Sequence, residues 1–313
     1  MLAGLGLSDP VSSLLPIKAN TPHPTPTTAI QGVSREALSA LFAEQGVRQI
    51  PIIDAAGQPV EVVTVDDFAL GHKAPPLRAV VMAGGFGKRL HPLTSDTPKP
   101  MLPVGGRPLL EVIIGQLRDR GIKSIYVSTH FREEKIIEHL GDGSGLGVDI
   151  SYLREESPLG TAGALGLMPT PTEPLLVING DILTDLDFRS MHCYHEKLKA
   201  KLTIAVRRYQ VQVPYGVVDS DGTSVIGIRE KPELGFFVNA GIYLLEPDVY
   251  NFIPQNSHFN MTDLIDRLIA HGEKVGSFPL REYWLDIGQR ADYDKAQRDL
   301  ENRGLTWIGE RKS

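Results

Sequence analysis

"LRAVVMAGGFGKRLHPLTSDTPKPML", residues Leu77 to Leu102, joins a short apolar run to a glycine-rich loop and a proline-rich segment. Such an apolar run, followed directly by glycines, is typical of a buried strand. Small residues after a strand let backbone N–H groups approach an anion closely, and Arg89 and Lys99 add fixed positive charge. The stretch therefore predicts a polyphosphate site at the end of a strand.

Two common phosphate-binding motifs do not fit this loop. A dinucleotide-binding motif needs glycines at its first, third and sixth positions, but the sixth position from Gly85 is Leu90. A P-loop needs Ser or Thr directly after its lysine, whereas Lys88 is followed by Arg89. The loop belongs to neither class.

Strand and helix patterns alternate after the loop. Apolar strands are predicted over residues 124–128 and 175–181, and helices over 109–117, 132–140 and 292–302, the first ended by Gly121. This order predicts an α/β sandwich on a mainly parallel, mixed sheet over residues 77–304. Ligands of such sheets bind at the carboxyl ends of the strands, so the glycine loop and Asp181 should share one edge.

The first 72 residues predict a smaller α+β unit with a linker. A helix capped by Ser34 carries Leu38, Leu41 and Phe42 on one face. Residues 47–54 and 60–65 then have the pattern of two strands joined by a turn. Residues 71–76 have the composition of a linker.

Composition excludes several classes of protein. The 313 residues carry a net charge of −6, which argues against a general nucleic-acid or membrane-surface binder. The sequence has no apolar run near the ~20 residues that span a bilayer and no signal-peptide pattern, so we expect a cytoplasmic protein. The single cysteine, Cys193, excludes an internal disulfide, and its place in a helical pattern predicts a buried thiol.

Residues 80–111, "VVMAGGFGKRLHPLTSDTPKPMLPVGGRPLLE", closely resemble the signature of sugar-1-phosphate nucleotidyltransferases. The resemblance extends to about Arg303 and includes "EESPLGTAGAL", "VINGD", "YGVV", "EKP", "NAGIYLL" and "YWLDIGQRADYDKA" in the family's order. Lys88 stands where Thr or Ser is commoner, which adds charge without removing a motif residue. The resemblance implies a Rossmann-like sandwich that joins a nucleoside triphosphate to a sugar phosphate.

The resemblance also implies a division of roles. The sugar-phosphate oxygen attacks the α-phosphorus and pyrophosphate leaves, with Arg89 on the pyrophosphate, Lys99 at the reacting phosphate and Lys231 on the sugar phosphate. Asp181 and Asp286 are the carboxylates expected to hold Mg²⁺, which prefers oxygen ligands. A helix N-cap or a surface turn is the alternative role for each aspartate.

The expected nucleotide contacts include Glu155, just before the Pro-Leu-Gly turn. Guanine presents two adjacent donors that one carboxylate can accept together, whereas uracil and thymine present one N–H between two carbonyls. GTP is therefore favoured, with thymidylyl or uridylyl transfer and a solvated loop role for Glu155 as alternatives. The full predicted nucleotide set is Met82, Gly84, Gly85, Gly87, Arg89, Glu155 and Gly160.

The expected sugar contacts are Gly216, Glu230 and Asn239. These residue types do not choose between mannose, glucosamine, glucose and a heptose. A non-catalytic nucleotide-sugar sensor is a further alternative, but a sensor is expected to lose a metal carboxylate or phosphate lysine that this chain retains.

The N-terminal unit resembles one half of a CBS module. "VVTVDDF", residues 62–68, has the Thr64 and Asp67 spacing that contacts ribose, although Glu61 stands where glycine is usual. Met1 to Pro16 resembles the end of another half. The resemblance implies either an adenine nucleotide or assembly of a homo-oligomer, and its fusion to this catalytic domain tilts the expected sugar toward glucosamine 1-phosphate. Hexapeptide repeats are absent from the sequence, so no fused acetyltransferase is expected.

Overall fold

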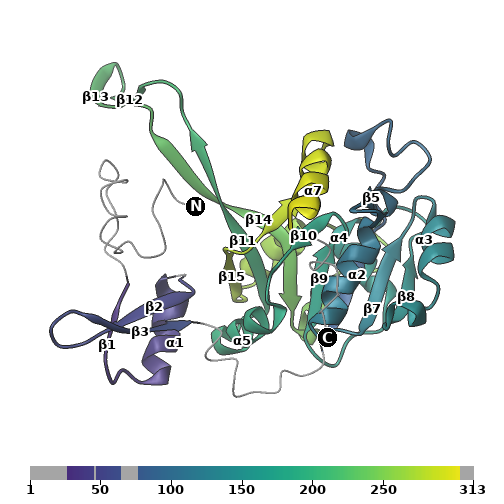
Figure 1. Cartoon of the computed structure of the whole chain (residues 1–313), viewed down its shortest axis with the longest axis horizontal. Coiled ribbons are helices and arrows are strands. Elements are labelled where there is room, and N and C mark those ends of the chain that lie inside the picture. Colours follow the sequence, from purple (N-terminus) through teal and green to yellow (C-terminus); the bar gives the residue numbers. More distant parts are fainter. Residues whose placement is uncertain (1–26, 46, 65–76, 304–313) are drawn as a thin grey trace. The chain divides into compact units, whose positions relative to one another are not determined.

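The computed structural model describes residues 27–45, 47–64 and 77–303 and divides into two units, Met1–Thr64 and Val65–Ser313. In the first unit, β1 (Ala29–Ile30) pairs parallel to β2 (Gln49–Ile53), and β2 pairs antiparallel to β3 (Pro59–Thr64). Helix α1 (Arg35–Gln45) connects β1 to β2 (Figure 1). Strand β1 was not predicted, because two residues at the end of a Pro- and Thr-rich stretch give no periodic signal.

Helix α1 begins as predicted. The Ala37 N–H donates to Ser34 Oγ at 3.2 Å, and Leu38 and Phe42 are buried. Asp67, the linker over residues 71–76 and the segment Met1 to Pro16 lie outside the described residues.

The larger unit is built on a seven-stranded sheet with the order β15-β11-β14-β9-β4-β7-β8. Strand β14 runs antiparallel to both of its neighbours, and the other neighbouring strands are parallel. The prediction of a mainly parallel, mixed sheet is confirmed. The strands of the sheet are β4 (Arg78–Met82), β7 (Ser124–Thr129), β8 (Asp149–Arg154), β9 (Leu175–Asn179), β11 (Leu202–Gln212), β14 (Glu233–Leu245) and β15 (Val275–Leu280).

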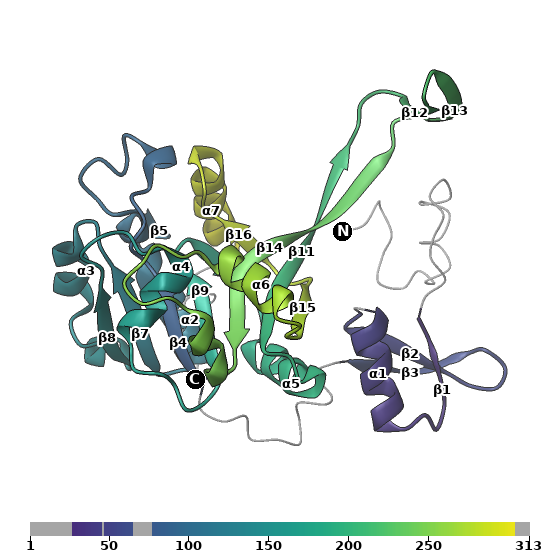
Figure 2. The same cartoon turned by 180° about the vertical axis from the view of Figure 1, so that it is seen from behind.

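Helices cover both faces of this sheet. Helix α2 lies over one face in Figure 1, and α4 and α6 lie over the other in Figure 2. Alternate residues of the strands, such as Val80 and Val177, are buried with Leu264 and Leu268 of α6. Gly121, with φ 86°, ends α2 as predicted. The helices are α2 (Leu109–Asp119), α3 (Glu133–Leu140), α4 (Gly160–Gly163), α5 (Phe188–Leu198), α6 (Met261–Ala270) and α7 (Arg290–Arg303).

Short elements complete the unit. Three pairs of short strands lie outside the main sheet: β5 (Pro103–Val104) with β6 (Arg107–Pro108), β10 (Ile182–Thr184) with β16 (Trp284–Asp286), and β12 (Val217–Asp221) with β13 (Ser224–Arg229). The 3₁₀ helices are η4 (Lys88–Leu90), η5 (Lys99–Met101), η6 (Ser144–Leu146), η7 (Ala164–Leu167) and η8 (Pro247–Phe252). Across the described ranges, no helix has the length and apolar character that a membrane span requires.

Strands β11 and β14 extend well beyond the sheet. Strand β15 accompanies β11 only as far as Arg207, and β9 accompanies β14 only from Ile242 onward. Beyond these points the described strands pair with each other, after a bulge between Ile204 and Val206. This two-stranded ribbon and the β12–β13 hairpin at its tip, residues 206–239, are called the arm (Figures 1 and 2).

Helix α5 buries Cys193, as predicted, together with His195. His195 Nδ1 lies 2.7 Å from Thr203 Oγ1, and Nε2 lies 3.1 Å from Glu246 Oε1. Burial lowers the pKa of His195 to about 4, and the neighbouring His192 contributes in the same direction. The native protein therefore keeps this imidazole neutral under mildly acidic conditions.

Acidification is expected to destabilise the protein through His195. As the pH falls below the ordinary pKa of ~6.5, this histidine is protonated in the unfolded chain but stays neutral in the native state down to a pH of about 4. The free energy of unfolding therefore falls as the pH falls through this range, by up to ~3 kcal/mol for this one group. Urea unfolding of the parent and His195→Gln between pH 7 and pH 4.5 measures this slope, which should be shallower in the variant. Equal slopes in the two proteins would contradict the assignment.

Candidate active site

The carboxyl ends of three parallel strands meet at one edge of the sheet. The register places Met82 of β4 opposite both Ser128 of β7 and Asn179 of β9. The Ala83 N–H donates to Ser128 O at 3.0 Å, and the Gly180 N–H donates to Met82 O at 2.8 Å. The glycine loop and Asp181 therefore leave the sheet side by side, as the sequence predicts.

The glycine loop is packed too closely for side chains at two positions. A Cβ atom on Gly84 would lie 2.7 Å from Glu155 Oε1. Gly87 has φ 62°, and a Cβ there would lie 2.9 Å from Thr94 Cγ2 and 3.0 Å from Lys99 Cβ. Because glycine has no side chain, the loop backbone can lie against Glu155 and Lys99, which are predicted to bind the base and the reacting phosphate.

Four predicted residues from distant segments form one charged cluster: Arg89, Lys99, Asp181 and Asp286. Lys99 Nζ donates a hydrogen bond to Asp181 Oδ2, and the lysine is largely buried. Strand β16 places Asp286 opposite Ile182, next to Asp181 in the chain. A Cβ on Gly288 would lie 3.5 Å from both Arg89 Nη1 and Asp286 Oδ1, so the guanidinium and the carboxylate face the same space.

The charged cluster fits a hard cation. Burial raises the pKa of the Asp286 carboxyl, Asp181 adds to this effect, and Lys99 and Arg89 oppose it. Asp286 Oδ1 is buried without a hydrogen-bond partner in the described structure, which is rare for a carboxylate oxygen. The described ranges contain no group of three or more metal-binding side chains. Two carboxylates completed by phosphate oxygens are, however, a usual arrangement for Mg²⁺.

A cavity of about 280 Å³ opens beside the charged cluster. It contains six of the predicted site residues. The cavity is lined by Met82, Gly84, Gly85, Phe86, Ser128, Glu155, Pro158, Gly160, Thr161, Asn179, Asp181, His258 and Asn260.

Glu155 is fixed in the wall of this cavity. Its Oε1 accepts from Ser128 Oγ at 2.9 Å, and its Oε2 accepts from the Leu159 N–H at 2.8 Å. Each carboxylate oxygen has a further lone pair that can accept another donor. The role of Glu155 in binding the base stays a prediction, and its orientation is set by protein contacts.

Several cavity residues were not predicted. Ser128 ends one predicted strand and Asn179 lies two residues before the end of another, so the shared strand edge could have indicated both. Phe86 makes ring contacts with His130 at 5.4 Å and with Phe131 at 5.7 Å between centroids. The other unpredicted lining residues are Pro158 and Thr161, which lie within the motif "EESPLGTAGAL", and His258 and Asn260, which carry no local signal in the sequence.

Of the predicted sugar contacts, Asn239 lies near the site. Its Oδ1 accepts from the Gly241 N–H at 2.9 Å, and its Nδ2 donates to the Tyr243 hydroxyl at 2.8 Å. A Cβ on Gly241 would lie 2.7 Å from Asn179 Nδ2, which places this turn of backbone against the cavity wall. Asn239 thus marks the base of the arm.

The other sugar-site residues lie at the tip of the arm. A Cβ on Gly216 would lie 3.2 Å from Glu230 Oε2, so the structure brings these two together, and Lys231 follows with φ 44°. Strands rise ~3.3 Å per residue, so the six steps from Asn239 to Glu233 carry the tip ~20 Å outward. Among the described residues, no hydrogen bond or ion pair joins Lys231 to the charged cluster.

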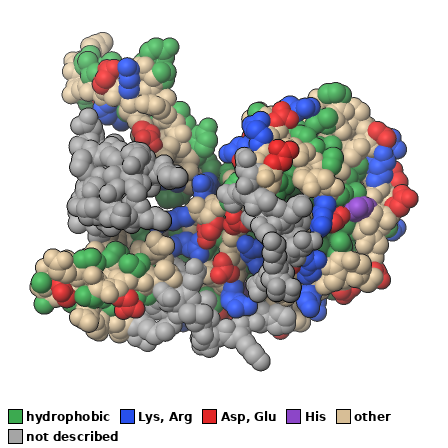
Figure 3. All heavy atoms as spheres, in the orientation of Figure 1, with side chains coloured by type: hydrophobic (Ala, Val, Ile, Leu, Met, Phe, Trp, Pro, Cys, Tyr) green, Lys and Arg blue, Asp and Glu red, His purple; other side chains and the backbone are tan. Residues whose placement is uncertain are grey.

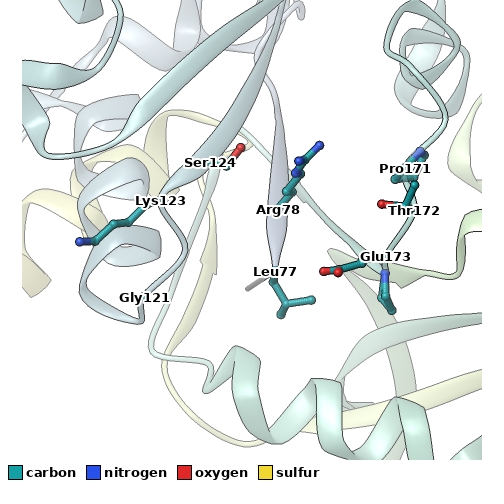
Figure 4. A pocket seen from close by; sticks show the side chains of 9 residues that line it. Leu77, Arg78, Gly121, Lys123, Ser124, Pro171, Thr172 and Glu173 are labelled. Atoms are coloured by element: carbon teal, nitrogen blue, oxygen red, sulfur yellow. The ribbon is translucent and has the colours of Figure 1, made fainter. Parts of the chain in front are cut away.

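A larger cavity, of about 430 Å³, lies at the opposite edge of the sheet. It is lined by the starts of β4 and β7 and by residues 171–174 before β9, and its charged side chains are Arg78, Lys123 and Glu173 (Figure 4). None of the predicted site residues lines it. The paired carboxylates and cations, rather than volume, therefore identify the candidate active site.

A glycine loop, two cations and two carboxylates meet at the carboxyl edge of the mixed sheet, and this arrangement is compatible with phosphate-containing ligands. The family model for nucleotidyl transferases matches residues 78–303, and the chain belongs to this family. The mannose-1-phosphate guanylyltransferase of Mycobacterium tuberculosis is 33% identical over 71% of the chain. The D-glycero-alpha-D-manno-heptose 1-phosphate guanylyltransferase of Aneurinibacillus thermoaerophilus is 32% identical over 72% of the chain.

The match covers 99% of the heptose enzyme but only 64% of the Mycobacterium protein. Two solved structures are also similar. A putative glucose-1-phosphate thymidylyltransferase from Bacillus anthracis superposes with a TM-score of 0.58 at 26% identity, over 71% of this chain and 94% of that one. HddC from Yersinia pseudotuberculosis, complexed with GMP-PN, gives 0.55 at 27% identity, over 71% and 99%.

Proposed function

We propose that the protein transfers a guanylyl group from GTP to a hexose 1-phosphate such as glucosamine 1-phosphate or mannose 1-phosphate, giving a GDP-sugar and pyrophosphate. The observation that carries this proposal is the charged cluster beside a cavity of about 280 Å³. The guanylyltransferase names of the two relatives and the guanine nucleotide bound to HddC support the choice of base.

The barrier to this reaction includes bringing two anions together. Arg89 provides a planar fork for the departing pyrophosphate, and Lys99 is held by Asp181 where the reacting phosphate would lie. Asp181 and Asp286 would hold Mg²⁺, which when bound neutralises charge on phosphate oxygens. Lys231 would bind the sugar phosphate, with Gly216, Glu230 and Asn239 on the sugar. These side chains would position the two substrates and neutralise their negative charge, so no covalent nucleophile is required.

A substrate panel tests the proposal. Four nucleoside triphosphates are paired with glucosamine, mannose, glucose and heptose 1-phosphates, and pyrophosphate release is measured with Mg²⁺ present. We expect GTP to give the highest kcat/KM. A preference for dTTP or UTP would establish the alternative transferase, and absence of release with every pair, despite nucleotide-sugar binding, would indicate a sensor.

The first unit is proposed to act as half of a CBS module. Its βαββ order and exposed hairpin are compatible with either nucleotide binding or assembly. Calorimetric titration with AMP and ATP distinguishes these roles.

Arg89 and Lys231 are expected to serve different substrates. Lys231→Ala should raise KM for the sugar phosphate by ~10-fold or more and affect GTP less, because one charge-assisted contact is lost. Arg89→Ala should chiefly lower kcat or weaken GTP. Lys88→Ala, which removes a neighbouring exposed cation, is the control and should change each constant only a few-fold. The same kinetic defect in the Arg89 and Lys231 variants would refute the division of roles.

A further inference from the structure

The glycine loop has a single side chain that can anchor it. Phe86 is the only residue other than glycine between Gly84 and Gly87, and it lines the cavity while 40% exposed. Glycine-rich backbone loses much conformational freedom when it is held in one conformation. The contacts of the Phe86 ring therefore help to hold the N–H groups of the loop in place.

His130 provides one of these contacts. The ring centroids of His130 and Phe86 lie 5.4 Å apart at an interplanar angle of 83°, a T-shaped arrangement that is favourable for aromatic pairs. Phe131 lies 5.7 Å from the same ring. A Cβ on Gly84 would lie 3.5 Å from His130 Cβ, so the histidine also lies beside the loop backbone.

The same imidazole holds the backbone of Glu155. The β7–β8 ladder ends at the pair Thr129 and Arg154, and the Glu155 N–H then donates to Thr129 O at 2.9 Å. His130 Nδ1 lies 2.8 Å from Glu155 O, and because a carbonyl oxygen can only accept, Nδ1 carries the proton and donates. One side chain therefore continues the strand pairing and fixes the backbone from which the Glu155 carboxylate reaches the cavity.

Surface charge gives little help in binding an anion. On the face of the larger unit that Figure 3 shows, Lys and Arg side chains are interspersed with Asp and Glu side chains. A mixed surface of this kind does not produce a broad positive field that would attract a nucleotide. Nucleotide affinity then depends on how well the groups of the cavity itself are placed.

We propose that His130 is a positioning residue of the nucleotide site. Its ring holds Phe86, and with it the glycine loop, while its Nδ1–H holds Glu155, the predicted base-binding residue. The base and the phosphates are thereby bound in one fixed relative arrangement. This inference rests on the proposed function for the role of Glu155.

Two substitutions separate the two contacts of His130. His130→Phe keeps an aromatic ring for Phe86 but removes the donor to Glu155 O. His130→Asn keeps a donor near the position of Nδ1 but removes the ring. Each variant is compared with the parent using GTP and ITP, which lacks the 2-amino group of guanine. The measurements are steady-state kcat/KM and calorimetric Kd.

His130→Phe is expected to lower the preference for GTP over ITP by ~3- to 10-fold, because the loss of one hydrogen bond lets the Glu155 carboxylate move away from the 2-amino group. His130→Asn should keep this preference and raise KM for both nucleotides by a similar factor, because the glycine loop loses a contact. Phe86→Leu should act like His130→Asn. Combining these two substitutions should weaken GTP binding no further than either does alone, since both remove the same ring contact.

His271 offers a matched control. Its Nδ1 donates to Arg267 O at 2.8 Å, and its ring lies 5.3 Å from the Phe252 ring, so it makes the same two kinds of contact. It is not among the described residues that line the cavity. His271→Phe and His271→Asn should therefore leave the preference for GTP over ITP unchanged.

Three results would overturn the inference. The first is an unchanged preference for GTP over ITP in His130→Phe, and the second is an equal loss of preference in His271→Phe, which would indicate a general loss of stability. The third is an unchanged KM for GTP in Phe86→Leu, which tests the loop contact whatever the stability of the His130 variants. A parent that prefers dTTP or UTP to GTP would instead refute the proposed function.

Discussion

Asp286→Asn is expected to lower turnover by ~10² or more, because a neutral amide is a poor ligand for a hard cation. Asp181→Asn should have a similar effect. Steady-state pyrophosphate release at saturating Mg²⁺ measures both. Near-normal turnover in either variant would defeat the assignment of that aspartate.

The stability of these variants separates a lost metal site from a damaged fold. Burial raises the pKa of Asp286, so the native state already disfavours its charge, and removing that charge should keep or raise the midpoint of thermal unfolding. Asp292→Asn is the matched control, because Asp292 also adds negative charge near Asp286 but is not a predicted metal ligand. It should keep turnover within a few-fold of the parent.

Glu155→Gln is expected to reduce selectivity for GTP. The amide replaces one acceptor oxygen with a donor that faces a guanine donor, which should cost ~1–3 kcal/mol, or roughly 5- to 150-fold in kcat/KM for GTP. Efficiency with dTTP or UTP should fall less or rise. Kinetics with the three nucleotides, at unchanged sugar-phosphate affinity, measure the effect.

The structure supplies a control for this experiment. Ser128→Ala removes the hydrogen bond to Glu155 Oε1 but leaves the carboxylate and its second bond to the Leu159 N–H. This variant should lose some efficiency with every nucleotide and keep the order of preference. If Glu155→Gln behaves like Ser128→Ala, Glu155 orients the loop and another residue recognises the base.

The location of the site could be predicted because it depends on short-range patterns. Glycines or Asn-Gly-Asp directly after an apolar run mark the end of a parallel strand, and the carboxyl ends of parallel strands lie at one edge of the sheet. That rule alone brings Asp181 to the glycine loop. The helix ended by Gly121 and the buried Cys193 also follow from local periodicity and end signals.

The remaining parts depend on tertiary structure. Asp286 reaches the cluster through the three-residue strand β16, which is too short for a periodic signal. The position of the arm depends on how β11 bends at the bulge near Ile204, and the motifs around Gly216 and Lys231 contain no information about that angle. Asn260 lines the cavity only because α6 packs near Gly160.

The β10–β16 pair also determines when the candidate metal site can form while the chain is being synthesised. The two carboxylates of the candidate metal site are 105 residues apart, from position 181 to position 286, and β16 is the last strand of the described chain. Chains emerge from the ribosome N-terminus first, so the sheet and glycine loop can form on a nascent chain that still lacks one metal ligand. On the proposed function, such a chain would present the phosphate-binding loop before it could hold the metal ion that nucleotidyl transfer requires.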